Sequence, residues 1–256
     1  MDDIAIAGVT VAIFGLGIII AVVGLIAWIW DWILLIRYTK YNGVAVSNGK
    51  TGREVAEKLL AENGLGNVAV APCGFWRWLI FGNSYSRRKQ TVFLRKNVID
   101  VASLVATATA ARIASLAILD KEGDKSVARR VHYQVWSLIA PWSFIPIIII
   151  GIIVDILVFA DLNLGLATII AVVFALLILL WGIFGEHFVL KSERSSCDRA
   201  IDLLLKGGLI NQSEVAIVRT FFDTYITRQI LKFILAILEF IKVLLQLVLT
   251  ILKSKK

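Results

Sequence analysis

Long apolar runs alternate with shorter polar segments along this chain of 256 residues. The first run, residues 4–36, contains one charged side chain, that of Asp31. A helix needs about 20 apolar residues to cross a bilayer, so this run predicts a membrane anchor that is not cleaved off. Two further runs, residues 136–159 and 164–184, are also long enough to cross. The pattern predicts a mostly α, multi-span integral membrane protein.

Charged residues beside these runs predict their orientation. Asp2 and Asp3 precede the first run, whereas Arg37 and Lys40 follow it. Since short loops rich in Lys and Arg stay on the cytoplasmic side, we expect the N-terminus outside the cell membrane and the next segment in the cytoplasm. The connection 161–163 carries no Lys or Arg, so it is expected outside.

Two polar segments are expected to pack into one cytoplasmic, α-rich domain with a small β element. The predicted organisation is an N-terminal transmembrane anchor at 1–37, a first cytoplasmic part at 38–133, a transmembrane helix at 134–160, an external loop at 161–163, a transmembrane helix at 164–190, a second cytoplasmic part at 191–230 and a C-terminal helix at 231–256.

Local signals place the elements of the first polar segment. Thr51 followed three residues later by Glu54 matches a capping box, which predicts a helix that ends at Asn63-Gly64. Alternating apolar residues predict short strands at 67–71 and 90–94.

The C-terminal stretch 231–256 leaves two interpretations open. Its polar residues recur at helical spacing and form one stripe: Lys232, Glu239, Lys242, Gln246, Thr250 and Lys253. Such a stripe favours a helix in the plane of the membrane or packed in an assembly, and a fourth span is the alternative.

The amino-acid composition indicates which classes of partner the chain can bind. The chain is 59% hydrophobic with a net charge of +8, and it lacks a basic strand interleaved with aromatic residues, so we expect membrane lipids and no nucleic acid. Two cysteines, Cys73 and Cys197, cannot build a disulfide framework and are expected reduced.

Several short segments after residue 38 occur in the order and at the spacing found in one known protein family. They are Lys40-Tyr41, Thr51-Gly52-Arg53-Glu54-Val55-Ala56, Asn63-Gly64-Leu65, Val68-Ala69-Val70-Ala71-Pro72, Arg199-Ala200-Ile201-Asp202-Leu203-Leu204 and Gly208-Leu209-Ile210. With these segments and the apolar runs, the chain resembles the YugP-like family of membrane-bound neutral zinc metallopeptidases. The resemblance implies a zinc site built on an H-E-x-x-H helix.

The zinc-binding motif is degenerate here. The family pattern A-A-H-E-x-G-H-A-I-Q aligns without a gap on residues 110–119. Arg112 and Leu116 stand at the two histidine positions, and Ile113 stands at the position of the catalytic glutamate. Zinc in such a site needs both histidines and a third ligand, with the glutamate as general base. The resemblance places the third ligand at Glu193.

These replacements predict a protein without catalytic residues, metal or cofactor. The motif lies in residues 98–119, a stretch rich in Ala, Ser and Thr that is expected to form one helix. If the family fold is retained, Arg112 and Glu193 should face each other as an ion pair. We therefore expect a pseudoenzyme that serves as a structural or scaffolding subunit, with a membrane protein partner or as a homo-oligomer.

Two other functions stay open. An active membrane-bound metallopeptidase or other hydrolase with a rebuilt site could use Cys73 or Cys197 with a histidine, although no nucleophile–base spacing supports it. A transporter or channel component is the other, although the spans lack paired charges, broken-helix signals and internal repeats. Asp155 is a carboxylate within a span, but no Lys or Arg partner accompanies it there, so we expect it to face another helix or the outer boundary.

Two surface segments are candidate interaction sites. The first is expected to be a loop that is strongly apolar for its position and binds a membrane or a partner, with Arg77 meeting a phosphate or carboxylate: Phe75, Trp76, Arg77, Trp78, Leu79, Ile80 and Phe81. The second is the run Arg87-Arg88-Lys89, which is expected to face anionic lipid.

Overall fold

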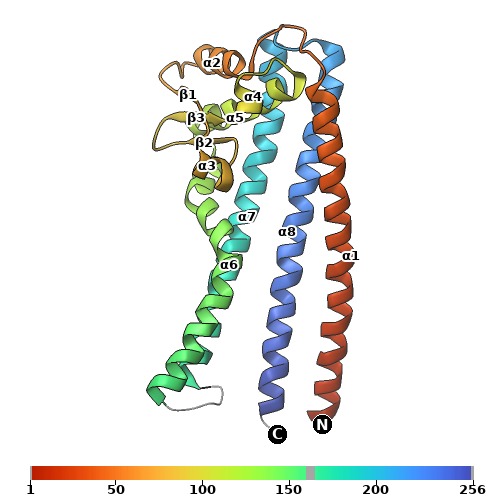
Figure 1. The fold of residues 1–256 in the computed structure, drawn as a ribbon, viewed down its shortest axis with the longest axis vertical. Coiled ribbons are helices and arrows are strands. Elements are labelled where there is room, and N and C mark those ends of the chain that lie inside the picture. The colour runs from red at the N-terminus through yellow and green to blue at the C-terminus, as the bar shows by residue number, and fades with distance from the viewer. Residues whose placement is uncertain (1, 160–164, 255–256) are drawn as a thin grey trace. The chain divides into compact units, whose positions relative to one another are not determined.

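The computed structural model describes residues 2–159 and 165–254 (Figure 1). The chain divides into two compact units. The helical unit holds the described parts of residues 1–29, 132–187 and 229–256, and the polar unit holds residues 30–131 and 188–228. The predicted external loop at 161–163 lies outside the described residues.

Three helices of the described chain are long and apolar enough to cross a membrane: α1 (Asp2–Asn42), α7 (Leu166–Lys206) and α8 (Gln212–Ser254). Helix α6 (Lys125–Phe159) bends by 57° after Ala140, and its two parts together qualify as a fourth. At 1.5 Å per residue, α1 is about 60 Å long. A bilayer core is about 30 Å thick, so α1 is longer than a span requires. Its last part, from Trp30, belongs to the polar unit.

Small residues allow α6 and α7 to pack closely within the helical unit. A side chain on Gly182 would collide with Ala140, and one on Gly185 would meet the carbonyl oxygen of Tyr133 at 2.9 Å. Such close approach is the usual way in which membrane helices associate. The Asp155 carboxylate accepts hydrogen bonds from the backbone N–H groups of Ala167 and Thr168, at 3.0 and 2.8 Å. This carboxylate therefore caps the start of α7.

The polar unit contains a three-stranded sheet in the order β1-β3-β2. Strand β1 (Ala69–Pro72) pairs in parallel with β3 (Thr91–Leu94), and β2 (Ser84–Ser86) pairs with β3 in antiparallel fashion. The two predicted strands are confirmed with small shifts at their ends. The sequence pattern does not predict β2, because Ser84-Tyr85-Ser86 is too short and polar to show an alternation.

Four helices accompany the sheet: α2 (Gly52–Glu62), α3 (Phe75–Ile80), α4 (Lys96–Ile99) and α5 (Leu104–Lys121). The capping box at the start of α2 is confirmed, because the backbone N–H of Thr51 donates to Glu54 at 2.7 Å and the Glu54 N–H donates to the Thr51 hydroxyl at 3.4 Å. Gly64 ends this helix with a positive φ of 69°.

The prediction of one helix over residues 98–119 is wrong, because the chain breaks between α4 and α5. The backbone carbonyl of Val101 accepts a hydrogen bond from Gly52, and the N–H of Leu104 donates to Val44, at 3.1 and 3.0 Å. These long-range bonds take backbone groups that a continuous helix would use itself. The Ser103 side chain then caps α5 by accepting from the N–H of Ala106.

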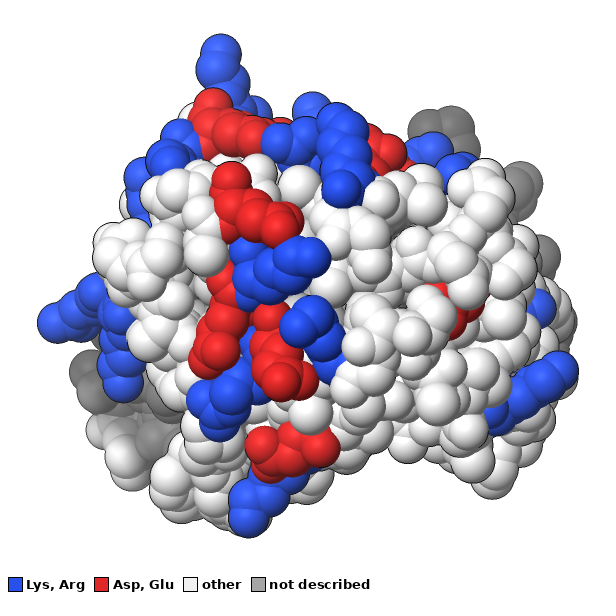
Figure 2. Space-filling model, turned by 90° about the horizontal axis from the view of Figure 1, so that it is seen from above, with Lys and Arg blue, Asp and Glu red and all other residues white. Residues whose placement is uncertain are grey.

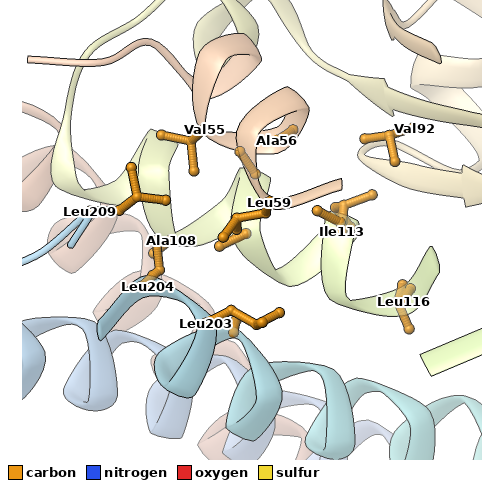
Figure 3. Close-up of a cluster of buried hydrophobic side chains, with 14 of the residues drawn as sticks. Val55, Ala56, Leu59, Val92, Ala108, Ile113, Leu116, Leu203, Leu204 and Leu209 are labelled. Atoms are coloured by element: carbon orange, nitrogen blue, oxygen red, sulfur yellow. The ribbon is translucent and has the colours of Figure 1, made fainter. Parts of the chain in front are cut away.

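Helix α5 is the centre of the polar unit, and every residue from Leu104 to Leu119 is buried. It packs against α2, α4 and the sheet. Figure 3 shows Leu59 of α2, Ile113 of α5 and Leu204 of α7 in the same cluster of apolar side chains. A helix that is buried all round places any charged side chain on it inside the protein.

Gly52, the first residue of α2, is expected to be sensitive to substitution. A Cβ atom here would collide with the backbone carbonyl oxygen of Val98, which cannot rotate away. We expect Gly52→Ala to lower the free energy of unfolding by about 1–3 kcal/mol, as overpacking does. Urea unfolding in detergent micelles measures this change. In the matched control Gly66→Ala the new methyl group meets no atom within 4 Å, so an equal loss in both variants would contradict the prediction.

Candidate functional site

The centre of α5 presents Arg112 to the inside of the polar unit. Its guanidinium forms an ion pair with the carboxylate of Glu193 on α7, and the two side chains are 9% and 3% exposed. It also donates to the hydroxyl of Tyr225 on α8 at 3.3 Å and lies over that ring at 4.6 Å. The predicted approach of Arg112 and Glu193 is therefore confirmed, in a buried position.

A second arginine completes this cluster. Arg130, near the start of α6, places a guanidinium nitrogen 2.5 Å from the other carboxylate oxygen of Glu193. The same nitrogen donates to the hydroxyl of Ser192 at 3.2 Å. Each oxygen of Glu193 therefore has its own guanidinium. We call Arg112, Arg130, Glu193 and Tyr225 the arginine cluster.

Sequence reasoning missed Arg130 and Tyr225. Arg130 follows Arg129 just before an apolar run, where basic residues are expected simply as membrane flanks. Tyr225 lies in the helix that leads to the C-terminus, far from the motif in sequence. No local signal distinguishes either residue, since only the packing of α6, α7 and α8 brings them to Glu193.

The charges of the cluster stabilise one another. Burial by itself raises the pKa of the Glu193 carboxyl, but the positive charges of Arg112 and Arg130 and their hydrogen bonds outweigh it and lower this pKa to about 2. Burial lowers the pKa of the Arg112 guanidinium, and Glu193 more than compensates, so this pKa is raised above its ordinary value. Glu193 is therefore a carboxylate and Arg112 is a cation at neutral pH.

The other two motif positions hold apolar side chains of the core. Ile113, which the family resemblance aligns with the catalytic glutamate, is fully buried, and Leu116, which it aligns with the second histidine, is 2% exposed. Both lie in the cluster of Figure 3. These side chains supply neither a general base nor a metal ligand, and they contribute to packing.

The two thiols are held in their protonated form. Burial raises the pKa of the Cys197 thiol, which lies one turn after Glu193 on α7. Burial also raises the pKa of Cys73, whose sulfur donates to the carbonyl oxygen of Gly82 at 3.0 Å. A thiol nucleophile needs a lowered pKa, so neither environment activates its cysteine.

The residues present do not fit a catalytic zinc ion. Among the described residues, no group of three or more His, Cys, Asp and Glu side chains could hold a metal. Glu193, which the family resemblance suggests as the third ligand, already engages a guanidinium with each oxygen. A cation at this place would have to displace Arg112 and Arg130, which carry the same sign of charge.

The apolar segment 75–81 forms a short helix, α3, and not the predicted loop. Five large apolar side chains point away from the polar unit and are exposed: Phe75, Trp76, Trp78, Leu79 and Ile80. Helical hydrogen bonds form within the segment: the N–H of Trp78 donates to the carbonyl of Gly74 at 2.8 Å, and the N–H of Phe81 donates to the carbonyl of Arg77 at 2.9 Å.

Arg77, which was expected to meet a phosphate or carboxylate, makes contacts within the polar unit. Its guanidinium lies 3.9 Å from the ring centre of Phe93, and its Nε donates to the Ser84 hydroxyl at 3.2 Å. Ring stacking and a hydrogen bond to the sheet hold the side chain inward.

The run Arg87-Arg88-Lys89 lies exposed in the turn between β2 and β3. Arg87 forms an ion pair with Asp120 at the end of α5, at 3.3 Å. Arg88 and Lys89 are therefore the members of this run that are available for an anionic surface.

The fold and the arginine cluster define a class of protein: mostly helical, with helices long and apolar enough to cross a membrane and with a buried ion pair between Arg112 and Glu193. Comparison with family profiles then shows that the chain belongs to the family described as "Putative neutral zinc metallopeptidase", whose profile matches residues 16–248. The family resemblance seen in the sequence is thus confirmed. Searches of curated proteins and of solved structures find no match.

Proposed function

We propose that this chain is a catalytically inactive member of its metallopeptidase family and acts as a structural or scaffolding subunit of a membrane protein assembly. The observation that carries this proposal is the arginine cluster. Arg112 stands where the family pattern has its first histidine, and both oxygens of Glu193 are engaged by arginines. The family profile matches residues 16–248, while Arg112, Ile113 and Leu116 supply no metal ligand at the motif positions, which supports a role in binding.

We also propose a cellular location for the chain. The chain would lie in the cell membrane with its N-terminus outside and its polar unit in the cytoplasm, where basic residues flank the apolar helices. Long helices with exposed apolar side chains support contact with lipid and with a membrane protein partner or another copy of the chain.

Metal content and proteolysis test the loss of activity. The protein purified from cells grown with added zinc is expected to contain far less than one zinc per chain by mass spectrometry of the metal, and to leave casein intact. The reason is that two fixed guanidinium charges occupy the environment of Glu193. An active zinc peptidase with an intact H-E-x-x-H motif serves as the positive control.

Two outcomes would contradict this proposal. The first is about one zinc per chain that disappears in Glu193→Gln, which would show a metal bound at the cluster. The second is cleavage of casein that is lost in Cys73→Ser or Cys197→Ser, which would favour a hydrolase with a rebuilt site.

A further inference from the structure

Helix α3 presents an apolar surface that the polar unit does not cover. We call its exposed side chains the α3 surface: Phe75 (67% exposed), Trp76 (73%), Trp78 (44%), Leu79 (60%) and Ile80 (50%). No residue of α3 is buried. Scattered apolar residues are normal on a protein surface, but a contiguous patch of large ones marks a site of interaction.

Contacts with strand β3 and with Arg95 fix the position of α3. Arg77 stacks on Phe93 of β3, and Arg95 lies 5.5 Å over the ring of Trp78 and donates to the Trp78 carbonyl at 3.4 Å. Phe75 and Trp78 stack on each other with ring centres 6.1 Å apart. The polar contacts of this helix face the sheet and its apolar side chains face outward, so the surface is preformed.

The sequence segment that carries α3 has charged residues of one sign only. Residues 63–99 contain six basic residues and no Asp or Glu: Arg77, Arg87, Arg88, Lys89, Arg95 and Lys96. Figure 2 shows one face of the molecule, on which acidic and basic side chains lie next to one another. Arg88, Lys89 and Lys96 are exposed. Aromatic side chains combined with free basic residues suit the headgroup region of an anionic bilayer.

The polar unit that carries this surface is covalently continuous with helices long enough to cross a membrane. The polar unit begins inside α1 at Trp30 and includes the last part of α7 from Phe188. Both helices continue without interruption into apolar stretches of membrane-spanning length. Attachment of this kind makes contact with the bilayer intramolecular, so even a modest surface binds. A separate protein partner would need to supply a complementary acidic and apolar face.

We propose that the α3 surface inserts into the boundary between headgroups and acyl chains of the membrane that holds the chain's own helices. Arg88, Lys89 and Lys96 would meet anionic headgroups around it. Interfacial helices bury an apolar face in this way while their basic residues stay with the lipid charges. This inference does not depend on whether the protein is catalytically inactive.

Depth-dependent quenching in nanodiscs tests the insertion. The full chain with Cys73→Ser carries a bimane label on a cysteine introduced by Leu79→Cys. The control carries the label on Ala61→Cys, at an exposed position of α2. The remaining native cysteine, Cys197, is buried and stays unlabelled. In nanodiscs of phosphatidylcholine and phosphatidylglycerol, brominated phosphatidylcholine is expected to quench the label at residue 79 at least threefold more than the label at residue 61. Equally weak quenching at both residues would overturn the proposal.

Two further experiments test whether lipid or protein covers the α3 surface, and whether the basic residues contribute to its contact with the membrane. A label at residue 79 that is protected from aqueous iodide but not quenched by bromine would show that protein covers the α3 surface, which overturns the proposal.

Nanodiscs of phosphatidylcholine alone, or the variant Arg88→Gln/Lys89→Gln/Lys96→Gln, are expected to reduce quenching at residue 79 about twofold or more. Unchanged quenching in both would overturn the contact with headgroups.

Discussion

Replacing Glu193 with alanine is expected to lower the free energy of unfolding by about 3–5 kcal/mol. The variant leaves the guanidinium groups of Arg112 and Arg130 inside the protein without a counterion. Removal of Arg112 should cost less, about 1.5–3 kcal/mol, because Glu193 then keeps Arg130 as its partner. The measurement is urea unfolding of each variant in detergent, followed by tryptophan fluorescence.

The exposed ion pair between Arg199 and Glu122 provides the matched control. Its side chains are 30% and 45% exposed, so water and salt screen the interaction. Glu122→Ala is expected to change the free energy of unfolding by no more than about 1 kcal/mol. If Glu193→Ala and Glu122→Ala have similar effects, the arginine cluster does not contribute to stability as its burial indicates.

Replacing Leu59 with alanine is expected to lower the free energy of unfolding by about 2–5 kcal/mol. Leu59 on α2 is fully buried against α5, and its side chain lies in the apolar cluster of Figure 3. Truncation removes contacts and leaves a cavity, because the helices around it are held by many other side chains. The same urea titration measures the loss.

Leu79→Ala makes the same chemical change on the α3 surface. Leu79 is 60% exposed, so we expect a change within about 0.5 kcal/mol in detergent. A loss as large as that of Leu59→Ala would show that α3 belongs to the core of the polar unit. In that case the insertion of the α3 surface into a membrane would also be wrong.

Local signals predict parts of the fold well. The capping box at Thr51 and the stop at Gly64 depend on neighbouring residues only, and both are present in the structure. The prediction of a loop at α3 fails because the helix is six residues long, and apolar composition alone does not separate a short helix from a loop. The extra break before Leu104 depends on backbone bonds to Val44 and Gly52, which no local pattern contains.

The sequence by itself determined the apolar helices, the family and the absence of an H-E-x-x-H segment, because each depends on residue type and spacing. Alignment with the family also led to the pair of Arg112 and Glu193. Only the tertiary structure decided that Arg130 and Tyr225 join this pair, since they come from helices distant in sequence. It also decided that Arg77 faces the sheet while its neighbours are exposed. Side-chain direction depends on what each helix packs against, and that information is not local.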